Sequence, residues 1–143
     1  MIPTGASTAN YQPTMQQIAD FEDSSLYFSI GIPSESTNIM PIIKDVSVVS
    51  LVEKVEAEYS QVNFNNGTRD PHMCLSPKRV IVMIRAICEE LSRIDPLNKE
   101  TYEQNSQSYI IQLEELDKKI QNSLKDAGNK FFYSISSGFW LFS

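Results

Sequence analysis

The single histidine of the chain is the residue whose chemistry most needs an explanation. His72 lies in the segment DPHMCLSPKR, residues 70–79, between a proline and the start of a predicted helix. A histidine at this position is either a surface residue of a capped turn or a metal ligand on a short rigid loop. A lone histidine is the commonest false sign of a metal site, so spacing alone favours the surface turn over the ligand.

The composition narrows the classes of function. Of the 143 residues, 41% are hydrophobic and 21% are charged, so one globular domain with a real core is expected. The formal net charge is −6 and the basic residues are scattered, which argues against nucleic acid as a partner, because phosphate binding needs a basic patch. There is no phosphate-binding loop, and one histidine without a suitable nucleophile argues against an enzyme.

Membrane and redox signals are weak. No stretch reaches the roughly 18–20 apolar residues of a membrane span. Met1 is followed directly by a turn-like sequence, so no signal peptide is expected, and either the protein stays in the cytosol or its front is missing. A disulfide between Cys74 and Cys88 stays open, but two cysteines make no disulfide framework. Cys88 falls among the apolar positions of a predicted helix, so we expect a buried free thiol there.

Short helices and strands alternate in the first half of the sequence. Thr14, with Gln17 three residues later, forms a capping-box pattern that opens a helix. Further elements are expected as strands over 25–32 and 46–49 and as helices over 35–43 and 51–59. A polar loop with an Asn-Gly turn signal follows over 61–70. The alternation predicts an α/β fold with a short parallel sheet flanked by helices, in which ligands bind on loops such as that of His72.

The second half of the sequence predicts two helices. Ser76 and Pro77 provide an N-cap and a first helical residue for one of them. Asp95-Pro96 opens the second, whose apolar residues recur at three- and four-residue steps until Gly128 stops it. About 30 residues at 1.5 Å each give roughly 45 Å, which is long for a compact domain and indicates a connecting rod. A coiled coil is the alternative, but its heptads are marginal.

Taken together, four stretches of the sequence resemble one family. It is the family of substrate-binding receptors of ABC importers for zinc, manganese or iron, of the lipoprotein-antigen and adhesin type. The resemblance runs from residue 1 to about 130, and its most specific part is Asp-Pro-His-x-x-Leu-Ser-Pro. The stretches that carry it are GASTANYQPT (5–14), LYFSIGIP (26–33), DPHMCLSPKRV (70–80) and IDPLNKETYEQNSQSYIIQLEELDKKI (94–120).

The resemblance implies an architecture of two α/β lobes joined by one long rigid helix, with a metal in the cleft. Each lobe of such a receptor supplies two metal ligands. Residues 1–94 would then be the N-terminal lobe without its first strand, and residues 95–127 the connecting helix. Residues 128–143 would be a stub of the second lobe.

The resemblance also implies roles for individual residues. His72 matches the family's second metal ligand, which shifts the balance from a surface turn to a ligand. The first ligand is usually a histidine two residues before Tyr11, where this protein has Ala9. Asn10 could contribute a carbonyl oxygen, although a turn residue is the better interpretation, because a neutral amide replaces imidazole poorly on zinc. Cys74 occupies the usual aromatic position, where packing is favoured over a thiolate ligand.

The last segment, FFYSISSGFWLFS (131–143), ends in large apolar residues that something downstream should cover. The family has its third ligand here, often within His-Pro-Ala-Phe-Gly-Tyr-Phe. Codons allowed for Phe131–Phe142, read one base later, encode FFIPSHPAFGYF, which contains that motif. We therefore hypothesise a frameshifted or mis-sequenced receptor gene.

The resemblance implies a non-enzymatic receptor that binds a divalent transition metal outside the cytoplasmic membrane and delivers it to an ABC permease. Membrane attachment would come only from a lipid anchor, which this sequence lacks. Because His72 is the only family ligand left, weak or absent metal binding is expected. The alternative is an adhesin-like interaction module that self-associates through the long helix and the apolar tail.

Overall fold

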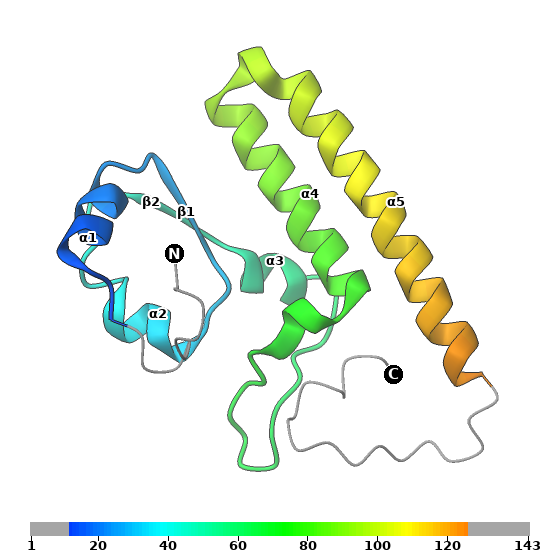
Figure 1. Ribbon diagram of the computed structural model, residues 1–143. Coiled ribbons are helices and arrows are strands. Elements are labelled where there is room, and N and C mark those ends of the chain that lie inside the picture. Colours follow the sequence, from blue (N-terminus) through cyan, green and yellow to red (C-terminus); the bar gives the residue numbers. More distant parts are fainter. Residues whose placement is uncertain (1–11, 126–143) are drawn as a thin grey trace. The chain divides into compact units, whose positions relative to one another are not determined.

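The computed structural model describes residues 12–125, which fall into two compact units (Figure 1). The first unit ends at Glu53 and the second begins at Lys54. The elements, in sequence order, are α1 (Met15–Glu22), β1 (Leu26–Ser29), α2 (Pro33–Asn38), β2 (Ser47–Ser50), α3 (Leu51–Glu56), the 3-10 turn η1 (His72–Leu75), α4 (Pro77–Ile94), the 3-10 turn η2 (Pro96–Asn98) and α5 (Lys99–Leu124). Helices combined with a parallel pair of strands confirm the expected α/β class.

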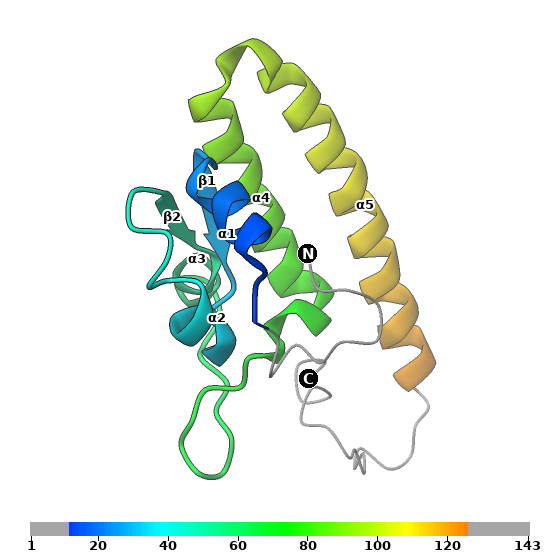
Figure 2. The same ribbon diagram turned by 60° about the vertical axis from the view of Figure 1, so that its left-hand side comes forward.

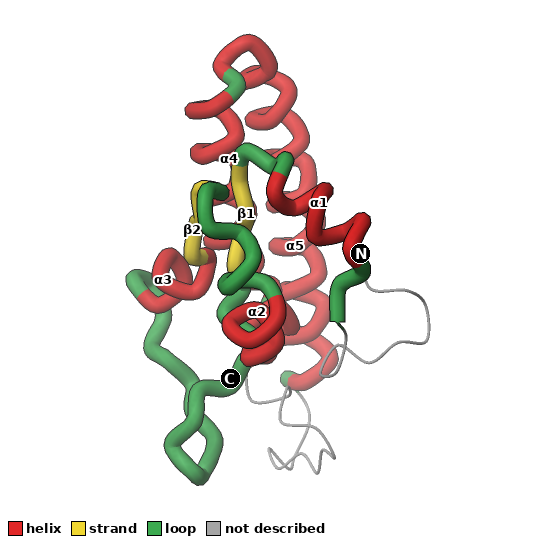
Figure 3. Tube along the Cα trace, turned by 90° about the vertical axis from the view of Figure 1, so that its left-hand side faces the viewer, coloured by secondary structure: helices red, strands yellow, loops and turns green. Residues whose placement is uncertain are grey.

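The sheet of the first unit is parallel, as expected. β1 and β2 pair in register from Leu26 opposite Ser47 to Ser29 opposite Ser50, and they lie side by side in Figure 3. Parallel strands need a crossover between them, and the segment containing α2 provides it.

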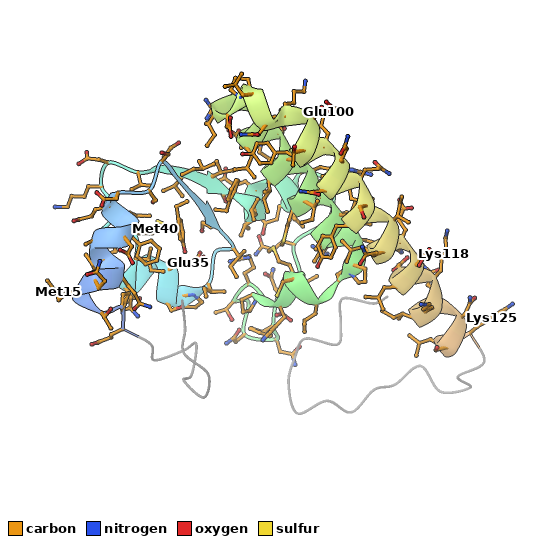
Figure 4. The ribbon with its side chains drawn as sticks, turned by 45° about the horizontal axis from the view of Figure 1, so that its top comes forward. Met15, Glu35, Met40, Glu100, Lys118 and Lys125 are labelled. Carbon is orange, nitrogen blue, oxygen red and sulfur yellow. The ribbon has the colours of Figure 1, made fainter. Side chains whose placement is uncertain are left out.

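The strand predicted over 25–32 is shorter in the structure because a side chain takes over its hydrogen bonds. The backbone N–H groups of Ile30 and Gly31 donate to the carboxylate of Glu35, over 3.1 and 2.7 Å. Glu35 is only 4% exposed and lies on α2, as Figure 4 shows. The two N–H groups are satisfied by this carboxylate, and β1 ends at Ser29.

Two further groups donate to the same carboxylate. The Tyr27 hydroxyl lies 3.0 Å and the Ser29 hydroxyl 2.6 Å from oxygens of Glu35. Burial, together with the Glu35 carboxylate and its hydrogen bond, raises the pKa of Tyr27. The buried carboxylate therefore ties β1 to the first turn of α2.

Helix boundaries in the first unit follow capping and proline chemistry. The capping box of α1 is confirmed, because Thr14 and Gln17 exchange backbone–side-chain hydrogen bonds of 2.9 and 3.3 Å. The helix predicted over 35–43 is shifted: α2 begins at Pro33, whose fixed φ suits a first helical residue, and ends before Pro41. The helix predicted over 51–59 ends at Glu56.

The first unit has a small apolar core. Phe21, Ile43 and Val46 are buried together, and the ring of Phe21 meets that of Tyr27 edge to face at 5.9 Å.

In the second unit, α4 and α5 run side by side, as Figures 1 and 2 agree. Ile81 of α4 is buried with Ile110 and Leu113 of α5, and Val80 and Ile84 pack against them. The apolar spacing therefore predicted the packing face of α5 only in part. Leu113 is buried as its spacing suggests, whereas Tyr109 and Leu116, which recur at the same steps, are each 46% exposed.

The starts of the two long helices differ from the prediction in one respect. Ser76 and Pro77 take the N-cap and first helical positions of α4, although the Ser76 side chain makes no capping hydrogen bond. Asp95-Pro96 opens the 3-10 turn η2 and not α5, which begins at Lys99. One carboxylate oxygen of Asp95 accepts hydrogen bonds of 2.8 Å from both Asn98 and Tyr102, which stabilises the tighter turn.

The long helix predicted from the sequence is confirmed as α5, whose 26 residues extend for about 39 Å. Within residues 12–125, no helix is both long and apolar enough to span a bilayer. The domain boundaries after residues 94 and 127 stay predictions. Other predictions concern residues outside the described range: Ala9, Asn10, Gly128 and 131–143.

Candidate metal centre

The loop before His72 folds into a narrow hairpin that ends at Asp70. The backbone N–H of Phe64 donates to the carbonyl of Thr68, and that of Asp70 donates to the carbonyl of Val62, each over 2.8 Å. Gly67 adopts a φ of +82° at the tip, which explains the Asn-Gly signal, because glycine tolerates this conformation at little cost. The hairpin thereby fixes the backbone of Asp70 two residues before His72.

Asp70 and His72 are joined through one carboxylate oxygen. One carboxylate oxygen, Oδ1, accepts the backbone N–H of His72 at 2.9 Å and lies 2.6 Å from Nδ1 of its ring. The Asp70 side chain is 1% exposed, whereas that of His72 is 39% exposed. An ionised carboxylate only accepts hydrogen bonds, so Nδ1 must carry the ring proton. In the neutral ring, Nε2 then has a free lone pair.

The backbone around His72 is constrained on both sides. Pro71 precedes it with a φ of −78°, and Pro77 begins α4 with one residue between it and the end of η1. Met73, the next residue, is 3% exposed and anchors the 3-10 turn in the second unit. A ring held by a short constrained turn and a buried carboxylate loses little conformational entropy on binding a ligand.

The structure corrects the interpretation of the cysteines. Cys74 is exposed, so the expectation that it packs is wrong: Met73 takes the buried position of η1, and Cys74 follows on the outer side of this tight turn. Cys88 is partly exposed, not fully buried as expected. Both thiols are free, and the open disulfide alternative is not formed.

The described residues do not assemble a set of metal ligands by themselves. Residues 12–125 contain no group of three or more histidine, cysteine, aspartate or glutamate side chains that could hold a metal ion. A structural zinc site normally has four ligands, and His72 provides one imidazole. Asn10, the auxiliary candidate, lies outside the described residues.

Asp70 is the residue that the sequence interpretation missed. The signal was present, since an aspartate two residues before another residue commonly accepts that residue's backbone N–H in an Asx turn. Its second oxygen, Oδ2, is buried and has no hydrogen-bond partner among the described residues. A carboxylate that orients a histidine through Nδ1 is the usual outer partner of metal-ligating histidines.

Comparisons with known proteins agree with the sequence resemblance. Residues 1–139 match the family described as ZnuA, zinc-uptake complex component A, periplasmic. The chain is 28% identical over 153 residues to the high-affinity zinc uptake system protein ZnuA of Bacillus subtilis (strain 168), with 97% of this chain and 48% of that protein covered. It is 28% identical over 156 residues to the manganese ABC transporter substrate-binding lipoprotein PsaA of Streptococcus mitis, with 100% and 50% covered.

A solved structure shows the same fold. The metal-dependent lipoprotein YcdH from Bacillus subtilis matches with a TM-score of 0.80 and 26% identity, covering 99% of this chain and 53% of that one. The chain spans about half the length of the curated relatives it matches. The expected likeness to the N-terminal half of a two-lobed metal receptor is confirmed. Since the family match covers nearly every residue, the chain belongs to the ZnuA family of periplasmic zinc-uptake components.

Proposed function

We propose that this protein acts in the uptake of a divalent transition metal as the substrate-binding component of an ABC importer, with His72 as a metal ligand. The contact between Asp70 Oδ1 and His72 Nδ1, at 2.6 Å, is the observation that carries this proposal. The candidate metals are zinc and manganese, which the names of the two relatives contain, and iron, which the sequence resemblance also allows. The metal is cargo, and no reaction is catalysed.

In this proposal, the two ring nitrogens of His72 have different roles. Asp70 holds the proton on Nδ1 and turns Nε2 of His72 toward the metal. With the proton held on Nδ1, the lone pair of Nε2 stays available to a cation. Because protons compete with the metal for Nε2, binding weakens as the pH falls.

The proposed partners follow from the family. A membrane permease of the importer would receive the metal, and the receptor would work outside the cytoplasmic membrane. The helix α5 would be the rigid connection to a second lobe. We also propose that the residues before it, up to 94, act as the metal-binding lobe.

By itself the 143-residue protein should bind metal weakly, because one imidazole is too few for a four-ligand site. Calorimetric titration with zinc chloride and with manganese chloride tests this. We expect no submicromolar affinity, and we expect the weak zinc binding to disappear in His72→Gln. Submicromolar binding would contradict the weak-binding proposal, and equal binding by His72→Gln would contradict the role of His72.

Self-association is a second candidate role, favoured by one observation. Tyr109 and Leu116 of α5 are each 46% exposed and lie seven residues apart, so two large apolar side chains share one exposed face of this helix. Sedimentation velocity at several protein concentrations tests it. A monomer at every concentration would count against this role, whereas a concentration-dependent dimer that Leu116→Lys abolishes would support it.

A further inference from the structure

The tip of the hairpin that precedes Asp70 has an unusual arrangement of side-chain and backbone groups. Asn66, Gly67 and Thr68 are all exposed. Figures 1 and 2 show this loop, between α3 and η1, extending away from α4 and α5. Water and solutes therefore reach the tip freely.

Two donors from one residue converge on the amide oxygen of Asn66. The backbone N–H of Thr68 donates to Oδ1 over 3.0 Å, and the Thr68 hydroxyl donates to the same atom over 2.6 Å. If a nucleophile adds to Cγ of Asn66, negative charge develops on Oδ1. Hydrogen bonds that are already aimed at an oxygen stabilise the charge that develops on it.

The nucleophile nearest in sequence is the backbone nitrogen of Gly67, the next residue. Gly67 has no side chain to obstruct the approach, and even an added Cβ would meet nothing within 4 Å. Its N–H donates to the carbonyl of Phe64 over 2.9 Å. This hydrogen bond closes an exposed turn, and such bonds open at a small free-energy cost.

We propose that Asn66 is a site of spontaneous deamidation, faster than the other asparagines of the described residues and assisted by Thr68. The Gly67 nitrogen loses its proton and bonds to Cγ of Asn66, while the bond from Cγ to the amide nitrogen Nδ2 breaks and ammonia leaves with a proton. The product is a cyclic imide. Water then adds to either imide carbonyl and opens the ring, which gives aspartate or isoaspartate at position 66.

The modification changes the loop in two ways. Either product adds one negative charge at the tip. Isoaspartate also routes the backbone through the side-chain methylene, which lengthens the turn between Asn63 and Arg69, the residues of the antiparallel bridge. Both changes lie in the hairpin that leads to Asp70.

Peptide mapping by mass spectrometry after incubation of the intact protein at mildly alkaline pH tests the proposal. We expect the mass gain of amide-to-acid conversion at Asn66, with isoaspartate among the products. Asn105 and Asn122 precede serines within α5 and serve as internal comparators. Modification of Asn66 no faster than that of these two would overturn the proposal.

Two variants separate the contributions of the neighbours. Asn66→Gln removes the modification at this position. Thr68→Val keeps the shape and the backbone donor but removes the hydroxyl, and we expect about fivefold slower conversion of Asn66. An unchanged rate in Thr68→Val would overturn the assisting role of Thr68, even if Asn66 remained the fastest site.

Discussion

A single carboxylate oxygen sets both the backbone turn and the ring orientation at His72. The sequence could single out His72 as a candidate ligand, because its motif is specific. For Asp70 it offered only an Asx-turn pattern, which does not say that the carboxylate also reaches the ring of His72. Side-chain exposure was equally hard to predict at this scale. Met73 and Cys74 are neighbours of similar apolar character, and the hand and pitch of η1 decide which of them is buried.

Replacing Asp70 with asparagine should release the ring of His72. The amide oxygen can still accept the backbone N–H of His72, but it carries no charge, so it favours a proton on Nδ1 less strongly than the carboxylate does. We expect a mixture of ring tautomers and about tenfold weaker zinc binding. Nitrogen-15 spectra of the ring measure the first effect and zinc titration the second. Glu114→Gln, which removes an exposed carboxylate from α5, is the control. If Asp70→Asn and Glu114→Gln gave the same ring tautomers and the same zinc affinity, Asp70 would have no orienting role.

At the scale of elements, the type of each predicted element was right and most of the boundaries were shifted. Periodicity and capping residues are local, so the capping box of Thr14 and the starts of α3 and α4 followed from the sequence. The end of β1 depends on Glu35, a residue of the next helix, and the start of α5 depends on a side-chain network around Asp95. Such tertiary contacts override local propensity.

The hydrogen bond from Tyr27 that helps to join β1 to α2 should make the stability of the folded protein fall at alkaline pH. The pKa of Tyr27 is raised in the folded state by burial and by Glu35, so the folded protein holds this proton more tightly than the unfolded protein. The resulting stability is fully present below the unfolded pKa of about 10 and is lost as the pH rises through the folded pKa.

Urea unfolding at neutral and at strongly alkaline pH should therefore show that the wild-type protein loses more stability than Tyr27→Phe. Tyr109→Phe, at an exposed position on α5, should behave as the wild type does. Equal alkaline losses in the wild type and Tyr27→Phe would refute the assignment.

The packing of α4 on α5 predicts that replacing two leucines of α5 by alanine lowers the free energy of unfolding by different amounts. Leu113 is 8% exposed at the interface, whereas Leu116 is 46% exposed. Leu113→Ala should lower the free energy of unfolding by about 2–4 kcal/mol, because it leaves a cavity. Leu116→Ala should cost about 1 kcal/mol or less. Thermal or urea unfolding followed by circular dichroism measures both, and similar costs would argue against the described interface.

At the scale of the whole molecule, the sequence predicted the fold class and the family, because the motifs and the alternation of elements extend over most of its length. The long helix was also predictable from its periodicity. The charges at the two ends of α5 also suit its dipole. Glu100 lies in the first turn and Lys125 at the C-cap, as Figure 4 shows, and a negative charge at the N-terminus and a positive charge at the C-terminus both stabilise a helix. A set of metal ligands is not visible at this scale: residues 12–125 hold no group of three or more histidine, cysteine, aspartate or glutamate side chains that could bind a metal.

The single histidine also makes the central claim directly measurable. In nitrogen-15-labelled protein, the imidazole signals come from His72 alone, so zinc titration can be followed at both ring nitrogens without ambiguity. We predict a ring protonated on Nδ1 before zinc is added and a zinc-dependent shift of Nε2 with Nδ1 still protonated. A ring protonated on Nε2, or two nitrogens that zinc leaves unchanged, would contradict the assignment of His72 as a metal ligand oriented by Asp70.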